Sequence, residues 1–335
     1  MNQTSVLDKL CVVTIHNTIW SGARHMRPED IRLGHGGQMP PRDVATLGSK
    51  KICDPKSLNI FRAIDGRMDA ACFAVGTRFL KGYAIPDTAL DALTAELDEH
   101  VAEFERKKQA FLQKYDEDVE KWIATHQEFE DVIRRSVLPA TEVERRLTAG
   151  YAVFRIGYAP AAQTESVLDD KVGGICGTLY REVEAEARDV LQSAYSGNVT
   201  RHILRPITRL LQKLDGLSFL DAGIGRLVAA LQPTLAGLQG IDGRRFTASE
   251  VTQVLSIVNL LTSTAAMKKI AAGLEPFTVP EANNLWLDGL KPEPGRDVED
   301  AFVGPIAPVP PSDEPAPENP PEPTDEEEAE ESFFL

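Results

Sequence analysis

Residues 87–136, DTALDALTAELDEHVAEFERKKQAFLQKYDEDVEKWIATHQEFEDVIRRS, decide the fold, because their apolar residues recur with a helical period. The seam combines residues seven apart with residues on the intervening positions: Leu90, Leu97, Phe104 and Phe111, then Val101, Tyr115 and Trp122. A heptad seam is typical of a helix that packs against another helix. The spacing therefore predicts a coiled-coil-like arm.

The arm is expected to have two legs. If residues 87–115 form one helix, it spans about 43 Å at roughly 1.5 Å per residue. Residues 117–136 are predicted to form the second leg, which Pro139 ends. A seam requires a partner helix without specifying which chain supplies it. A helical hairpin and a homodimeric coiled coil fit this pattern equally well.

Two segments outside the arm predict a small antiparallel sheet. Residues 10–20, LCVVTIHNTIW, alternate and are rich in β-branched and aromatic types, which favours a half-buried strand. Residues 151–158, YAVFRIGY, alternate in the same way, and we expect them to pair with residues 10–20. A short strand is also predicted over residues 77–85. The sheet would lie at the base of the arm.

Helices are predicted on both sides of the arm from their end signals. Asp54 can cap a helix over residues 55–75 that begins with Pro55 and is stopped by Gly76. Further helices are expected over residues 164–195, 199–214 with Pro206 inside it, 217–231 and 247–273. The last of these begins with a capping box, Thr247-Ala-Ser-Glu250.

The predicted fold class is mainly α with α+β character: a long coiled-coil-like helical hairpin on a small antiparallel sheet, followed by a C-terminal helical bundle. Four regions are expected: an α+β region with basic loops at 1–86, the arm at 87–150, a strand plus helical bundle at 151–290, and a disordered Pro-rich acidic tail at 291–335. The chain shows no internal repeat.

Charge is distributed unevenly over these regions. Residues 1–86 hold 12 Lys and Arg against 7 Asp and Glu, whereas residues 87–150 hold 9 against 16. Residues 151–290 are nearly neutral, and residues 291–335 hold 2 basic residues against 14 acidic ones. The tail therefore supplies most of the net charge of −15, and its surplus of charge and proline favours disorder.

The last residues of the tail differ in chemical character from the acidic residues before them. After the acidic residues 325–331 come Ser332, Phe333, Phe334 and Leu335. An acidic spacer that ends in two aromatic rings, a leucine and a carboxylate resembles a short docking peptide. Bacterial single-strand DNA-binding proteins end in a comparable acidic tip. We expect Phe333 to Leu335 to dock a partner protein, and the alternative is a solubilising tail whose aromatic residues are incidental.

Two groups of basic residues are candidate contacts with nucleic acid or with an acidic protein surface, of which this chain's own tail is one. One lies near Trp20 in the N-terminal loops: Arg24, Arg27, Arg32, Arg42, Lys50, Lys51 and Lys56. The other recurs every four residues along one predicted helix: Arg201, Arg205, Arg209 and Lys213. Convergence of the first group on a groove would favour DNA, and its pairing with Asp30 and Asp43 would disfavour it. The alternative is a set of ordinary surface residues.

No motif names a reaction, so no catalytic, cofactor or metal residue is predicted. Neither a Gly-x-x-x-x-Gly-Lys-Ser/Thr loop nor a Gly-x-Gly-x-x-Gly turn occurs. Residues 172–178, VGGICGT, lie within a predicted helix, where a kink or close helix packing explains the glycines better than catalysis does. His16, His25 and His35 match no metal-site spacing. The four separated cysteines are expected to be buried thiols.

The chain has no apolar run long enough for a transmembrane helix and no secretory pattern at its start. We therefore expect a soluble cytoplasmic protein.

Three segments resemble a bacterial family known as a domain of unknown function: residues 5–24 (SVLDKLCVVTIHNTIWSGAR), 47–55 (LGSKKICDP) and 78–86 (RFLKGYAIP). The resemblance continues through the arm to Val153–Ile156 and is looser in the later helices. Members occur on plasmids, integrative conjugative elements and phage-like islands, with genes often near those of a MoxR-type AAA+ ATPase and a von Willebrand factor A protein. The family has no established catalytic residues, so the resemblance implies context only.

Two hypotheses follow. The first is a non-enzymatic helical scaffold or adaptor of a mobile genetic element, whose arm and tail present docking surfaces to an ATPase assembly or to copies of itself. The second is a nucleic-acid-binding protein in element replication or transfer, with a tail that docks a partner or regulates binding. Salt-dependent DNA binding would separate them.

Overall fold

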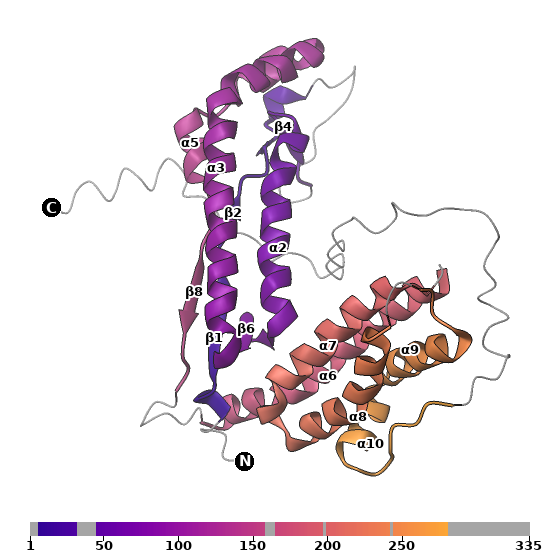
Figure 1. Ribbon diagram of the computed structural model, residues 1–335. Helices are drawn as coiled ribbons and strands as arrows, with labels where there is room; N and C mark the ends of the chain where they lie inside the picture. Colours follow the sequence, from indigo (N-terminus) through magenta and orange to yellow (C-terminus); the bar gives the residue numbers. More distant parts are fainter. Residues whose placement is uncertain (1–5, 32–44, 158–164, 197–198, 242–243, 281–335) are drawn as a thin grey trace. The chain divides into compact units, whose positions relative to one another are not determined.

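The computed structural model describes residues 6–31, 45–157, 165–196, 199–241 and 244–280 (Figure 1). It contains the predicted pairing between the strand near the N-terminus and the strand that begins at residue 151. Strand β1 (Leu10–Ile15) pairs antiparallel with β8 (Tyr151–Phe154), with Val12 opposite Phe154. On its other side β1 pairs with β6 (Gly82–Pro86), and β5 (Thr77–Phe79) completes the order β5-β6-β1-β8.

Short strands continue or accompany this sheet. Strands β2 (Thr18–Ile19) and β7 (Leu147–Thr148) pair in the same register as β1 and β8, so the predicted strand 10–20 is one ladder with a break at residues 16–17. A separate ribbon joins β3 (Ala23–His25) to β4 (Ser49–Lys51).

Apolar residues cover both faces of the central strand. Val12 and Ala84 belong to one hydrophobic core, whereas Val13, Tyr83 and Ile85 belong to a second core. Successive side chains of a strand point to opposite faces. The sheet therefore lies between two cores and contributes residues to each.

The second core is built on two antiparallel helices, α2 (Asn59–Val75) and α3 (Asp87–Thr125), which lie side by side in Figure 1. Asp54 accepts a hydrogen bond from the Lys56 N–H, and a short 3₁₀ turn, η2 (Pro55–Leu58), leads into α2. The ring of Phe61, near the start of α2, lies 4.9 Å from the ring of Phe104 on α3. The seam of the arm is thus covered by a helix of the same chain.

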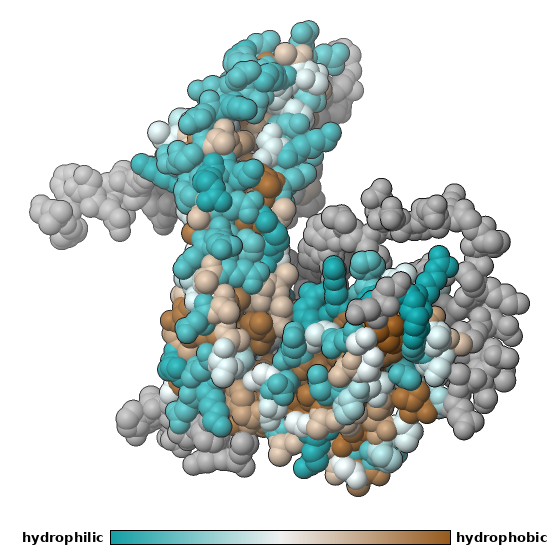
Figure 2. Space-filling view, viewed as in Figure 1, coloured by the Kyte–Doolittle hydropathy of each residue, from teal (hydrophilic) through white to brown (hydrophobic). Residues whose placement is uncertain are grey.

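The expected second leg over residues 117–136 is wrong. Helix α3 continues to Thr125, because Val119 and Ile123 extend its buried face and no Gly or Pro interrupts the chain before Pro139. The elements that follow are short: η3 (Gln127–Phe129), α4 (Glu130–Arg134) and α5 (Ala140–Arg145). Figure 2 shows hydrophilic residues over most of the visible face of α3, as expected where the apolar seam is turned inward.

The first core is completed by the later helices. They are α6 (Glu165–Ser196), η4 (Arg201–Ile203), α7 (Leu204–Gly216), η5 (Ser218–Leu220), α8 (Ala222–Gln239), α9 (Ala248–Leu261) and α10 (Thr264–Ala271). The capping box of Thr247 and Glu250 is confirmed. The predicted helix 247–273 is divided, because the Ser263 side chain accepts from the Ala266 N–H and starts α10.

These observations confirm the predicted fold class: the chain is mainly helical, with a small antiparallel sheet. All described residues belong to one compact unit, residues 1–293. Among the described residues, no single helix is long and apolar enough to cross a membrane; α9 and α10 meet that requirement only as a pair, which is bent by 96°.

Candidate interaction surfaces

The N-terminal basic residues do not converge on one groove in the described part of the chain. Lys50, on β4, forms an ion pair with Asp30 of the turn η1 (Pro28–Asp30), and both side chains are at least nine-tenths buried. Burial alone would raise the pKa of Asp30, but hydrogen bonds from Lys50 and from the Arg27 N–H hold it below its usual range. This is the pairing that disfavours a nucleic-acid groove.

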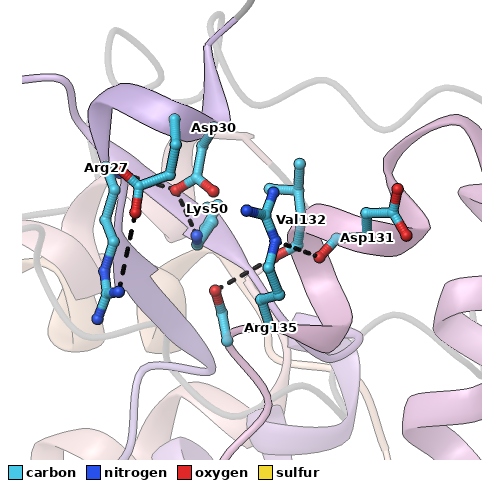
Figure 3. A network of polar contacts seen from close by, with 8 residues as sticks. Arg27, Asp30, Lys50, Asp131, Val132 and Arg135 are labelled. Atoms are coloured by element: carbon cyan, nitrogen blue, oxygen red, sulfur yellow. Dashed lines mark hydrogen bonds and ion pairs between the residues drawn. The ribbon is translucent and has the colours of Figure 1, made fainter.

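In the described part of the chain, the side chains of the other members do not pair with Asp30. In Figure 3 the Arg27 side chain points away from the pair formed by Asp30 and Lys50, and it lies 3.9 Å from Glu29. Arg24 is directly opposite Lys50 in the β3–β4 ribbon, and Lys51 is exposed. Arg32 and Arg42 lie outside the described residues.

The second basic group divides along α7. Arg205 and Arg209 are exposed, and the Arg201 guanidinium donates to the Gln239 carbonyl. Pro206 lies in the first turn of α7, where its missing N–H breaks no helical hydrogen bond. Lys213 is buried, so the predicted basic stripe ends one turn before it.

Lys213 is held in a buried network between the two cores. Its Nζ lies 3.1 Å from Glu182 and 3.3 Å from Glu186, both on α6, and 3.5 Å from the centre of the Phe73 ring on α2. Glu182 also accepts from the Arg78 N–H. Burial raises the pKa of Glu186, and the neighbouring Lys213 counteracts that rise. No local pattern in the sequence indicates these partners, because they lie on α6 and α2, far from Lys213 in the chain.

The outer edge of β8 is a surface that the sequence pattern did not indicate. The His16 N–H donates to the Gly150 carbonyl directly opposite, and the Asp87 N–H donates to Lys9 in the β1–β6 register. Hydrogen-bonded pairs alternate along an antiparallel ladder. Ala152 and Phe154 therefore bond to β1, whereas the backbone groups of Tyr151 and Val153 point away from it.

That edge carries apolar side chains and no covering strand within the described ranges. β8 is the last strand of its sheet, while the opposite edge strand, β5, contacts α6. Val153 is 38% exposed and Phe154 is 43% exposed. The Tyr151 hydroxyl donates to Asp98 on α3 at 2.6 Å, which fixes the start of the strand. Among the described residues, the edge is thus open and uncharged, and one end of it is anchored to α3.

The remaining residues considered in the sequence give weaker evidence of a functional site. Cys11, Cys53 and Cys72 are buried as expected, and Cys176 is partly buried. Burial raises the pKa of Cys72 to about 12. An open cavity of about 360 Å³ between α7 and α8, lined partly by Gln212 and Gln232, contains none of the predicted site residues. Among the described residues, no group of three His, Cys, Asp or Glu side chains is placed to hold a metal.

The glycines of residues 172–178 lie on an open face of α6. Among the described residues, a Cβ added to Gly173, Gly174 or Gly177 would meet no atom within 4 Å, so close helix packing, one of the two structural explanations given with a kink, does not account for these glycines. These glycines lower the helix propensity of α6 without a contact that requires them.

Replacing Gly174 with alanine is expected to raise the free energy of unfolding by about 0.5–1 kcal/mol, because alanine loses less backbone entropy in a helix. Urea unfolding followed by circular dichroism measures this. Gly223→Ala is the matched control, since its Cβ would lie 2.9 Å from the Ala271 carbonyl and should destabilise the protein. A less stable Gly174→Ala protein would mean that this face is covered in solution.

The predicted docking residues Phe333, Phe334 and Leu335 lie outside the described residues. A family model described as "Protein of unknown function (DUF3150)" matches residues 7–263. The match includes most of the first core, all of the second core, the arm and β8, and it leaves out the α10 residues of the first core and the tail. No curated protein matches the chain significantly, and neither does any solved structure.

Proposed function

We propose that the chain, which belongs to the DUF3150 family of unknown function, is a non-enzymatic scaffold or adaptor. It joins proteins by accepting an added strand at the outer edge of β8. The open edge is the observation that carries this proposal. An extended segment can bond to an exposed edge strand through its backbone, while neighbouring side chains provide specificity. On β8 the groups available for this are the outward N–H and C=O of Tyr151 and Val153.

The surroundings of β8 support a docking role over a purely structural one. β1, to which it bonds, is anchored by β6 on its other side and by a core on each face. An edge held in this way loses little conformational entropy when a partner strand binds. Val153 and Phe154 add apolar area that such a partner would cover.

The partner class that we propose is the one implied by the resemblance: a MoxR-type AAA+ ATPase and a von Willebrand factor A protein of a mobile genetic element. The C-terminal residues Phe333 to Leu335 would give a second attachment point on a long acidic tether. Two weak attachments on one chain bind more tightly than either alone when the tether lets both engage.

Replacing Val153 with proline tests the edge. Val153 does not bond to β1, so Val153→Pro removes an outward N–H while leaving the hydrogen bonds of the β1–β8 ladder in place. Complexes of the full chain, alone and with the purified ATPase and von Willebrand factor A protein, are measured by native mass spectrometry. We expect at least a tenfold loss of the complex that uses β8.

Val153→Thr is the matched control, because it keeps both the N–H and the β-branched shape, and it should assemble as the unmodified protein does. Assembly that is the same in Val153→Pro and Val153→Thr, or no assembly under any of these conditions, would contradict the proposal.

A further inference from the structure

Strand β8 is a short edge strand of four residues, but it lacks the charges, proline and bulge that also keep edge strands apart. Exposed edges of natural sheets usually carry charged residues, proline or a bulge. Residues 151–154 read Tyr-Ala-Val-Phe, with neither a charge nor a proline, and they pair with β1 in continuous register without a bulge. An uncharged edge without a bulge favours pairing with another strand.

The outward groups of β8 are arranged symmetrically about Ala152. Tyr151 and Val153 point away from β1, one on each side of Ala152. If a second β8 lies antiparallel about a two-fold axis at Ala152, Tyr151 of each copy faces Val153 of the other. Each of these pairs is then of the type that exchanges two backbone hydrogen bonds.

We infer that the strand seated on this edge is β8 of a second copy of the chain, so that two sheets join into one across a two-fold axis. The inference rests on the proposed function, because it names the occupant of the same edge. Val153 and Phe154 lie on opposite faces of β8, so the joined strands cover apolar area on both sides of the sheet.

Charge favours a second copy over the acidic tail as the occupant. The Arg155 guanidinium, just after β8, donates to Asp87 and to the Asp8 carbonyl, each at 2.9 Å. Its charge is therefore already neutralised and offers little to the acidic residues 325–331. In the two-fold arrangement Arg155 faces Ala149 of the other copy, so no like charges meet.

The first test is the mass of the purified full chain, measured by light scattering after size exclusion at increasing concentrations. The unmodified protein and Val153→Thr are expected to reach twice the monomer mass, and Val153→Pro is expected to remain at the monomer mass. A monomer at every concentration for the unmodified protein would overturn the inference.

A disulfide test places the axis and does not depend on a disruptive variant. Ala152 of the two copies would form a pair without mutual hydrogen bonds, whose Cβ atoms lie about 4.5–5.5 Å apart, a spacing that a disulfide can close with a small adjustment. Ala152→Cys should form a covalent dimer on mild oxidation, whereas the control Thr148→Cys, four residues from the axis, should not. Equal crosslinking of both variants would overturn the register.

Three other results would contradict a second copy as the occupant of the β8 edge. Dimers that appear only after removal of residues 325–335 would mean that the tail occupies β8. A protein that is monomeric alone, yet forms a Val153-dependent complex with the ATPase or the von Willebrand factor A protein, would overturn this inference and leave the proposed function standing. If neither dimers nor complexes respond to Val153→Pro, both fail.

Discussion

Replacing Lys213 with alanine is expected to lower the free energy of unfolding by about 3–5 kcal/mol. The Lys213 side chain is 1% exposed and lies between two carboxylates on α6. Removing it leaves Glu182 and Glu186 facing each other without a cation, and a buried unpaired charge is costly. The loss of the contact with the Phe73 ring adds to the effect.

Guanidinium unfolding of the full chain, followed by circular dichroism, measures this change. Arg209→Ala is the matched control, because Arg209 lies on the same helix one turn earlier but is exposed; its effect should stay within about 0.5 kcal/mol. Adding Glu182→Gln and Glu186→Gln to Lys213→Met should recover much of the stability, since both unpaired charges are then gone. Equal losses for Lys213→Ala and Arg209→Ala would contradict the buried network.

Replacing Phe104 with alanine is expected to cost about 3–5 kcal/mol, independently of protein concentration. Phe104 is fully buried, and its ring lies 4.9 Å from that of Phe61 on α2. The substitution leaves a cavity between α2 and α3 of one chain. Since no second molecule contributes to this contact, dilution should not change the loss.

The measurement is urea unfolding at protein concentrations that differ by a factor of one hundred. Gln109→Ala, on the exposed face of α3, is the control and should change the free energy of unfolding by less than about 0.5 kcal/mol. A midpoint that falls on dilution in the unmodified protein but not in Phe104→Ala would mean that the seam joins two chains, as a homodimeric coiled coil does.

Local signals in the sequence predicted the parts of the fold that depend on neighbouring residues. The cap at Asp54, the capping box at Thr247 and the antiparallel pairing of β1 with β8 are all present, although β8 ends at Phe154. Caps and alternation act over a few residues, so the sequence displays them directly. The heptad seam likewise predicted that α3 packs against a helix.

The identity of that helix could not be predicted, because an apolar seam accepts any apolar partner. α2 precedes the arm in the chain, whereas the two alternatives predicted for the partner were residues 117–136 and a second chain. The prediction that Lys213 belongs to an exposed basic stripe failed for a related reason. Lys213 follows the spacing of Arg205 and Arg209, and only the packing of α6 and α2 against α7 turns it inward. The candidate edge of β8 depends on which strand ends the sheet, which is also a property of the assembled fold.

The strand order also sets a sequence of events during synthesis. Val12 on β1 pairs with Phe154, which follows it by 142 residues. At about 5–20 residues per second, a ribosome needs roughly 7–28 s to add that stretch. Once residues 82–86 have been added, about midway through this interval, β6 can bond to one side of β1, while the side that later receives β8 stays open. A nascent chain therefore presents β1 as its temporary edge, and chaperones or neighbouring nascent chains on a polysome meet that strand before β8 emerges.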